Sequence, residues 1–309
     1  MSLLILYSLN IVVFYLFVII SEKKIEKLKG EAMKGNFVVK SHQISSSLSV
    51  FTGDYKPENC ETVFFPGCSL SGYNSNIVNK TFEYLSSKID NIGLIVACCS
   101  KPSCDIKDNK RHTKIEGTLK EKLKDYGIKN VITACSNCFI MFKQYQGIKV
   151  ISLWEVLDNI KEDDFNGIGE GIDLDIALHD PCPIRKEDII HDSVRSILKA
   201  SGYKYQEFDN CRSRTICCGA SGMMMARNPV LAKALMTKRA NSTKSSRIVS
   251  YCESCVQSMI VGGKESLHLL DLLFNEKVKR GDFKTQTSIP LLKHWVERRK
   301  TSLIPRKRR

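Results

Sequence analysis

Ten of the thirteen cysteines in this 309-residue sequence form two sets with closely similar spacing. The first set reads C-x29-CC-x35-CxxC and the second reads C-x34-CC-x33-CxxC. Two copies of one pattern indicate an internal repeat, which has to be recognised before the fold is considered. The sets are Cys68, Cys98, Cys99, Cys135 and Cys138, and Cys182, Cys217, Cys218, Cys252 and Cys255.

Thiols with this spacing are suited to metal ligation. A CxxC turn brings two thiolates to one metal centre in zinc sites and iron–sulfur sites alike. The adjacent pairs favour a cluster, because neighbouring side chains diverge and reach different metal atoms more readily than one tetrahedral ion. A structural zinc site needs four ligands, so it would leave one thiol of each set over. Gly219 and the small residues after it would let the chain approach inorganic sulfide closely.

The remaining cysteines do not fit the two sets. We interpret Cys60, Cys104 and Cys211 as small buried or spare thiols, and Met223–Met225 as packing residues at a helix start. The odd number of cysteines and their grouping as CC and CxxC indicate metal binding in a reducing compartment, not a disulfide framework.

Alternating strands and helices are expected to position the cysteines. Each cysteine group comes just after a short apolar segment, which places it at the carboxyl edge of a parallel sheet. We expect strands in residues 61–68, 93–99, 130–138, 175–182 and 247–255, a strand or turn in 216–222, and helices over 76–89, 117–127, 191–202 and 229–240. The sequence therefore predicts an α/β protein with two tandem repeats of an open, mostly parallel α/β domain, preceded by one N-terminal transmembrane helix.

The transmembrane helix is expected from Leu3–Ile20, an uncharged run of 18 residues. Lysines directly after it predict an outside N-terminus and cytoplasmic domains, in a single-pass protein of the cell membrane. A cleaved signal peptide is the alternative, but the basic start and the small-residue cleavage site are absent. The expected order is an anchor (1–22), a linker (23–58), a first cysteine-rich domain (59–160), a second one (172–278) and a basic tail (279–309).

The net charge of +14 is concentrated near the two ends of the chain. Residues 21–40 carry six lysines against three glutamates, and residues 293–309 carry eight basic residues against one glutamate. Such segments would contact anionic membrane lipid, although a solvated tail is an equal alternative. Nucleic-acid binding is not expected, because no basic face with interleaved aromatic residues is evident in the folded part.

The segments "HDPC", "CCGASG" and "CESC" resemble the CCG cysteine-rich domain, which occurs in tandem in the B subunit of heterodisulfide reductase and in the related D-type protein. The resemblance covers about residues 60–275. It implies that each set of five cysteines holds a noncubane [4Fe-4S] cluster and that the paired clusters reduce a disulfide. The first set has Ser100 where the family has glycine, and Pro183 stands where D-type members have histidine. His179 is then the nearest polar residue that could act beside the ligands, and a histidine hydrogen-bonded at a strand end is an equal alternative. Gly219 is the other residue expected next to the ligands.

These observations predict a membrane-anchored iron–sulfur subunit of an oxidoreductase that transfers electrons to a disulfide or related acceptor. No ferredoxin-type CxxCxxCxxxCP run occurs, so a ferredoxin-type iron–sulfur, flavoprotein or cytochrome subunit is expected as electron donor. The competing hypothesis is a non-catalytic assembly module of a membrane redox complex that holds zinc in one or both sets.

Overall fold

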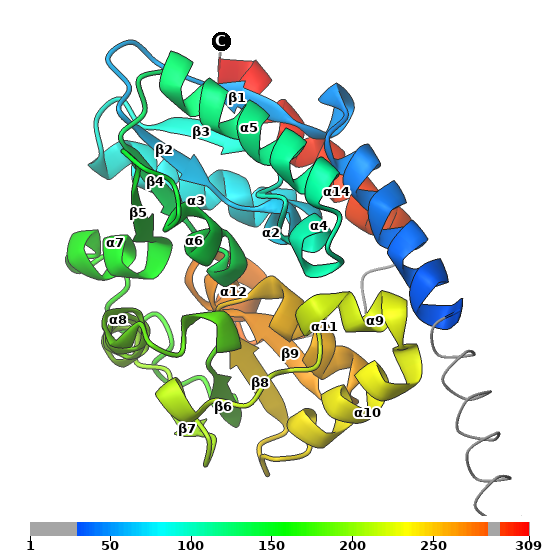
Figure 1. Cartoon of the computed structure of the whole chain (residues 1–309). Helices are drawn as coiled ribbons and strands as arrows, with labels where there is room; N and C mark the ends of the chain where they lie inside the picture. The colour runs from blue at the N-terminus through cyan, green and yellow to red at the C-terminus, as the bar shows by residue number, and fades with distance from the viewer. Residues whose placement is uncertain (1–29, 284–290, 309) are drawn as a thin grey trace, which may run out of the picture.

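The computed structural model describes residues 30–283 and 291–308. These residues form two α/β halves, each built round its own sheet (Figure 1). The first sheet has the order β1-β3-β2-β4-β5 and the second has the order β7-β6-β8-β9. The strands are β1 (Gly53–Tyr55), β2 (Thr62–Phe65), β3 (Gly93–Val96), β4 (Asn130–Thr133), β5 (Lys149–Ser152), β6 (Ile176–His179), β7 (Tyr205–Glu207), β8 (Arg247–Ser250) and β9 (Glu265–His268).

The two sheets repeat one arrangement. Strands β3-β2-β4-β5 are parallel neighbours in the first sheet, as β7-β6-β8-β9 are in the second. The first sheet adds β1, which pairs antiparallel with β3 at the edge. Strands β3 and β6 are buried at every position, as parallel strands covered on both faces must be. The structure thus contains the predicted internal repeat as a mixed α/β fold with parallel sheets.

Helices cover both sheets, and several begin at recognisable caps. Asn74 accepts hydrogen bonds from two N–H groups at the start of α3, and Ser152 with Glu155 forms a capping box at the start of α7. The helices are α2 (Cys68–Tyr73), α3 (Ser75–Lys88), α4 (Lys101–Asp105), α5 (Asn109–Asp125), α6 (Ser136–Phe142), α7 (Leu153–Ile160), α8 (Asp188–Ala200), α9 (Met224–Arg227), α10 (Pro229–Ala240), α11 (Glu253–Val261), α12 (Leu269–Phe274), α13 (Glu276–Lys279) and α14 (Leu291–Leu303).

One hydrophobic core runs through both halves. It includes Phe64 and Leu94 from the first sheet, and Leu178 and Val249 from the second. The Trp154 ring of α7 meets the Tyr251 ring at a centroid distance of 5.7 Å. Burial of apolar surface therefore holds the halves together, which fixes the two sets of cysteines relative to each other.

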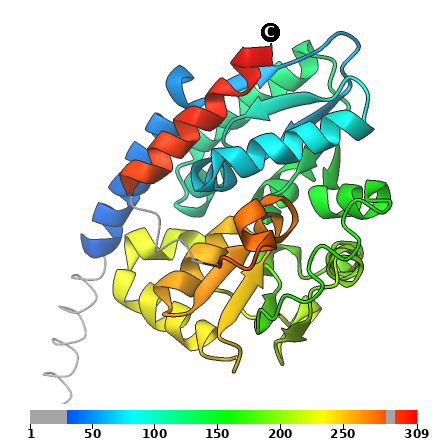
Figure 2. The ribbon, with the colours of Figure 1, turned by 180° about the vertical axis from the view of Figure 1, so that it is seen from behind.

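Residues near the two ends of the chain form paired helices. Residues 30–46 are helical, and this N-terminal helix lies beside α14 in both views of the ribbon (Figures 1 and 2). The Trp295 ring contacts the His42 ring at 5.1 Å and the Phe51 ring at 4.6 Å. The expected linker (23–58) and basic tail (279–309) therefore both contribute packed helices to the first half.

The expectation of a transmembrane helix and a single-pass membrane location is corrected. Among the residues that the structure describes, none of the helices combines the length and the apolar character needed to cross a membrane. Leu3–Ile20, on which the expectation rested, lie outside the described residues.

Candidate functional site

The cysteines of the first set meet at the carboxyl edge of the first sheet. Cys68 begins α2 just after β2, the adjacent pair follows β3, and Cys135 and Cys138 lie at the start of α6 after β4. Hydrogen bonds join the thiols of Cys68 and Cys98, of Cys99 and Cys138, and of Cys135 and Cys138. The structure therefore brings all five predicted residues of this set together.

The second set forms in the same way at the edge of the second sheet. Cys182 begins a short 3-10 helix after β6, and Cys252 with Cys255 lies at the start of α11 after β8. Hydrogen bonds join Cys182 to Cys217, Cys217 to Cys218, Cys218 to Cys255, and Cys255 to Cys252. All thirteen cysteines lie in the described part of the chain, and all are free thiols.

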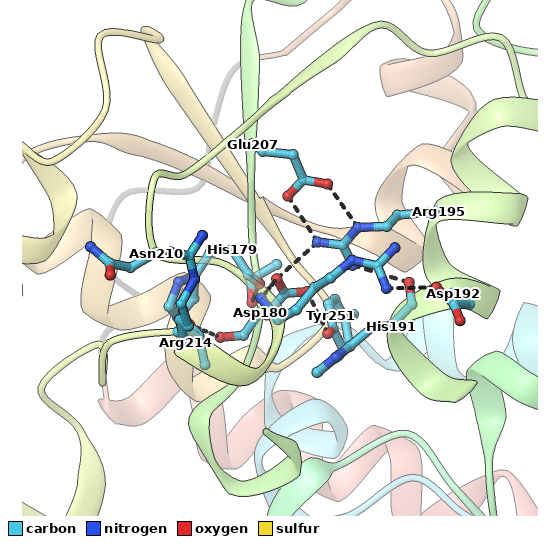
Figure 3. A network of polar contacts seen from close by, with 12 residues as sticks. His179, Asp180, His191, Asp192, Arg195, Glu207, Asn210, Arg214 and Tyr251 are labelled. Carbon is cyan, nitrogen blue, oxygen red and sulfur yellow. Dashed lines mark hydrogen bonds and ion pairs between the residues drawn. The ribbon is translucent and has the colours of Figure 1, made fainter. Parts of the chain in front are cut away.

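The chain leads from a strand to the adjacent cysteine pair by a short link in the first set and by a longer loop in the second. Cys98 comes two residues after β3, whereas a longer loop separates β7 from Cys217. Residues 216–220 form no strand, and a 3-10 helix (Ser221–Met223) follows them. Figure 3 shows the network that holds this loop, which is centred on the buried Asp180 of the "HDPC" segment.

Asp180 holds the loop with both its side chain and its backbone. Its carboxylate accepts hydrogen bonds from Arg195 at 2.9 and 3.1 Å, from Tyr251 at 2.7 Å and from the Arg212 N–H at 2.6 Å (Figure 3). Thr215 donates a 2.7 Å bond to the Asp180 carbonyl. Burial alone would raise the pKa of Asp180, but its bonds and charge contact with Arg195 keep the pKa below the ordinary value. Sequence reasoning missed this network, although "HDPC" contains its central residue.

His179 lies directly beside the second set. Its Nδ1 accepts hydrogen bonds from Arg239 at 3.2 and 3.3 Å, while its Nε2 is buried without a partner among the described residues. His179, Cys218 and Cys255 each offer one possible ligand atom, and these three atoms all lie within 4.8 Å of one another. Burial, followed by the charge of Arg239, lowers the pKa of His179 to about 3, so the ring is neutral at pH 7. The neutral ring with Nδ1 as acceptor carries its hydrogen on Nε2.

Hydrogen bonds give each set a thiol that ionises readily. In the second set, bonds from Cys182 and Cys218 hold the pKa of Cys217 far below its ordinary value. A bond from Cys255 similarly lowers the pKa of Cys252 to about 7. In the first set, a bond from Cys98 lowers the pKa of Cys68. Thiolates are the form of cysteine that binds metal, so both sets have the chemistry that an iron–sulfur cluster requires.

Backbone conformation explains three small residues near the cysteines. Gly67 has φ +82°, and a Cβ there would lie 3.0 Å from the Cys135 Cβ. Gly219 has φ +95° and donates its N–H to the Cys217 sulfur at 3.3 Å, but an added Cβ would meet Met236 of α10. Gly219 therefore also permits helix packing, beyond the approach to sulfide that we expected. Ser100 adopts φ +66° at the glycine position of the first set, and its hydroxyl lies 2.7 Å from His112 Nδ1.

The two sets face each other across the junction of the halves. The Ser69 and Ser254 hydroxyl oxygens, one beside each set, are 3.4 Å apart. The side chain of Ser136, which follows Cys135, is close enough to Cys252 to help lower the pKa of that thiol. Cys135 and Cys252 are close enough for the charge of one thiol to raise the pKa of the other. The starts of α6 and α11 therefore bring the two CxxC turns together.

A cavity of about 440 Å³ reaches Cys98 from the side of the N-terminal helix. Its apolar wall includes Ile44, Leu48 and Ile115, and its lining contains basic but no acidic side chains. The basic residues are Arg111, Lys114 and Lys122, all from α5. Gln43, at the end of the same N-terminal helix, is fully buried and donates a 3.4 Å hydrogen bond to the Cys98 sulfur. Sequence reasoning placed none of these residues near the cysteines.

The residues outside the two sets have other surroundings. Cys60 is buried and donates a 3.3 Å hydrogen bond to the Thr62 carbonyl, as expected of a packing thiol. Cys104 is exposed on α4, and Cys211 lies near Asp180 and Glu207. Met223 and Met224 are half-buried and Met225 is exposed. Pro183 lies in the 3-10 helix that begins at Cys182.

The cysteine-rich domain family, CCG, matches this chain twice, over residues 62–143 and 176–260. The D-type component of dihydromethanophenazine:CoB–CoM heterodisulfide reductase from Methanosarcina mazei is 26% identical over 235 residues, which are 68% of this chain and 56% of that protein. An uncharacterized iron–sulfur protein of Methanococcus maripaludis is 23% identical over 75% of this chain and 51% of its own length. This chain spans about half the length of these curated relatives.

Two further comparisons are more distant. The EtfAB:quinone oxidoreductase of Syntrophomonas wolfei is 25% identical over 46% of this chain and 22% of its own length. The solved structure of Picrophilus torridus aspartate racemase aligns with 72% of this chain and 99% of its own, at 13% identity and a TM-score of 0.32. That structural likeness is too weak to bear on fold or activity.

Proposed function

Because this chain belongs to the CCG family of cysteine-rich domains, we propose that it is an iron–sulfur subunit of an oxidoreductase in which each set of five cysteines holds a noncubane [4Fe-4S] cluster. The observation that carries this proposal is the convergence of five free thiols, from three separate segments, at the edge of each sheet. The buried Nε2 of His179, which has no partner in residues 30–283 and 291–308, supports it, because this N–H needs an acceptor such as a cluster sulfur.

Iron–sulfur clusters supply one-electron transfer. The surrounding residues would then have distinct tasks. His179 donates its Nε2 hydrogen toward the second set, and Asp180 holds the loop that carries Cys217. The common hydrophobic core keeps the two sets adjacent, and the Ser69 and Ser254 hydroxyl oxygens lie 3.4 Å apart between them. Electrons can therefore pass between the halves over a short distance, as a two-electron reaction carried out by two one-electron centres requires.

We place the electron acceptor in the cavity beside Cys98. Apolar walls and a lining with basic but no acidic side chains suit an anionic organic molecule. Arg111 pairs with Asp108 and Lys122 with Asp54, so Lys114 is the basic residue of the lining without an ion pair among the described residues. A disulfide or a related compound is the acceptor class, and its reduction consumes two electrons and two protons to give two thiols. The electron donor is a ferredoxin-type iron–sulfur, flavoprotein or cytochrome subunit. Two relatives that are named as a reductase component or as an oxidoreductase support a place in a redox complex.

Metal analysis of the anaerobically purified chain tests this function. The proposal expects about eight iron atoms and matching acid-labile sulfide per chain, that is four iron atoms for each set. Zinc without iron or sulfide would instead establish the second candidate, a non-catalytic assembly module. That candidate draws on the ability of CxxC turns to hold zinc as well as iron.

The acceptor site can be tested separately. The dithionite-reduced protein is mixed with dithiodiglycolate, which is anionic, or with its uncharged dimethyl ester, and reoxidation is followed by absorbance. Faster reoxidation by the anion, lost in Lys114→Gln, supports the cavity as the acceptor site. Lys110→Gln is the matched control, because Lys110 lies on the same helix but not in the cavity lining. Equal rates for both compounds would place the acceptor elsewhere.

A further inference from the structure

A positive charge is buried close to the first set of cysteines. Arg298 of α14 is 0% exposed. Its Nη2 donates a 3.0 Å hydrogen bond to the Ser46 carbonyl and its Nε a 3.5 Å bond to the Phe51 carbonyl, while Nη1 has no partner in the described part of the chain. Among the described residues, no acidic side chain forms an ion pair with Arg298. An unpaired buried charge is costly, so this guanidinium requires a negative charge nearby.

Helix packing brings Arg298 to the cysteines. Helix α14 packs on α2, which begins at Cys68, and Thr301 donates a 2.8 Å hydrogen bond to the Ser71 carbonyl. The two helices are so close that a Cβ on Gly72 would lie 2.1 Å from the His294 ring. Arg298 also bonds to Ser46, three residues after Gln43, whose side chain donates a hydrogen bond to the Cys98 sulfur. The guanidinium is therefore close enough for its charge to act on both Cys68 and Cys98.

The two histidine rings near Arg298 add no positive charge to the site. Burial is the main cause that lowers the pKa of His42, and it lowers the pKa of His294 to about 4, so both rings are neutral at pH 7. The Trp295 ring lies 5.7 Å from the guanidinium and closes one side of the site. Arg298 is therefore not joined by a second positive charge from these rings, and the cysteine set beside it, or what that set holds, can supply the matching negative charge.

We propose that Arg298 is the counter-charge of the iron–sulfur cluster held by Cys68 and its set, and that it raises the reduction potential of that cluster. This inference rests on the proposed function. Reduction adds one electron, and a buried cation stabilises the more negative, reduced form. Both the N-terminal helix and α14 lie outside residues 62–260, which bound the two family matches, so this cation is supplied by segments added to the shared domains.

The test compares three variants of the full chain in redox titrations followed by electron paramagnetic resonance. Arg298→Gln should make reduction of one cluster about tenfold less favourable, which corresponds to about 59 mV for a one-electron couple, and should leave the other cluster unchanged. Arg298→Lys keeps the charge and should restore most of the potential. Arg299→Gln is the matched control, since Arg299 lies on the same helix but is partly exposed and bonds to the Val50 carbonyl.

The outcomes separate the inference from the function. If iron and sulfide are absent from the unaltered chain, the proposed function fails before Arg298 is considered. If iron is present and Arg298→Gln shifts neither cluster more than Arg299→Gln does, the counter-charge role is wrong and Arg298 serves only to bond the Ser46 and Phe51 carbonyls. Should Arg298→Gln fail to fold, two other variants still test the proposal: Arg298→Lys, which keeps the charge, and Gly72→Ala, whose added methyl group displaces α14. The proposal is supported if the reduction potential falls in Gly72→Ala and is kept in Arg298→Lys. The reverse result overturns it.

Discussion

Tyr73 donates a 2.5 Å hydrogen bond to Asp271, and this bond links the two halves of the molecule inside their common core. Tyr73 is the last residue of α2, the helix that begins at Cys68, and Asp271 lies in α12, which follows the last strand of the second sheet. Asp271 also accepts a 3.1 Å bond from the His268 N–H, so it caps α12 as well. A single buried carboxyl thus contributes to one helix start and to the contact between the halves.

The stability of the protein should depend on pH through Asp271. Burial raises the pKa of Asp271 from 3.8 to about 6. A carboxyl that binds its proton more tightly when folded contributes most while it is protonated, so stability should fall by up to about 3 kcal/mol as the pH rises from 4 to 6. Asp271→Asn should remove this dependence in urea unfolding, and Asp125→Asn, an exposed control, should keep it. A slope that persists in Asp271→Asn would assign it to other groups.

Substitution of single ligands should empty one set and spare the other. Cys218→Ser should lower the iron content by about half, because each set is gathered at the edge of its own sheet. Cys211→Ser is the control, since Cys211 lies beside Asp180 and Glu207 instead. Iron and sulfide analysis of anaerobic preparations gives the measurement. Equal losses in the two variants would mean that the second ligand set is wrongly chosen.

Gly67→Ala should damage the first set more than a comparable change elsewhere. Gly67 has φ +82° and ψ 163°, and an added Cβ would lie 3.2 Å from the Cys138 sulfur. We expect a loss of about 1–3 kcal/mol in unfolding free energy, together with iron loss from that set. Gly147→Ala separates the two causes, because Gly147 also has positive φ but open space around it. The Gly147→Ala variant should lose stability and keep its iron. Iron loss in both variants would contradict the view that the added Cβ at position 67 displaces the Cys138 sulfur.

The network around Asp180 should be important for stability. Arg195→Met leaves the buried Asp180 carboxylate without its bidentate partner and should cost about 3–5 kcal/mol in urea unfolding. Arg212→Gln breaks only an exposed pair with Asp192 and should cost less than about 1 kcal/mol. Comparable losses in the two variants would show that the buried pair has no special weight.

The position of the cysteines was predictable because it depends on local signals. A short apolar segment followed by cysteine indicates a strand end, and parallel strands collect their ends at one edge. By contrast, β5 with α7 and β9 with α12 were missed, since each short strand runs into its helix without a glycine or proline between them. The available signal was the capping box, with Ser152 and Glu155 in one copy and His268 and Asp271 in the other.

The helices outside the repeats could not be recognised from hydrophobic pattern. The buried face of the N-terminal helix includes Val39, Gln43 and Ser46, which have helical spacing but are mostly polar, so the segment reads as a linker. The sequence does not distinguish Arg298 from the other basic residues of its segment, because its burial depends on the packing of α14 on α2. The burial of Ser46 and the burial of Arg298 arise from packing between residues more than 200 positions apart in the sequence.

The pairing of α14 with the N-terminal helix also sets an order of events during synthesis. A ribosome adds roughly 150 residues between the last cysteine of the first set and the start of α14, which takes on the order of 10 s. Through that interval the first sheet can form with all five thiols present but without Arg298 over Cys68. The last helix can therefore dock only after the five thiols of the first set have been in place for that interval.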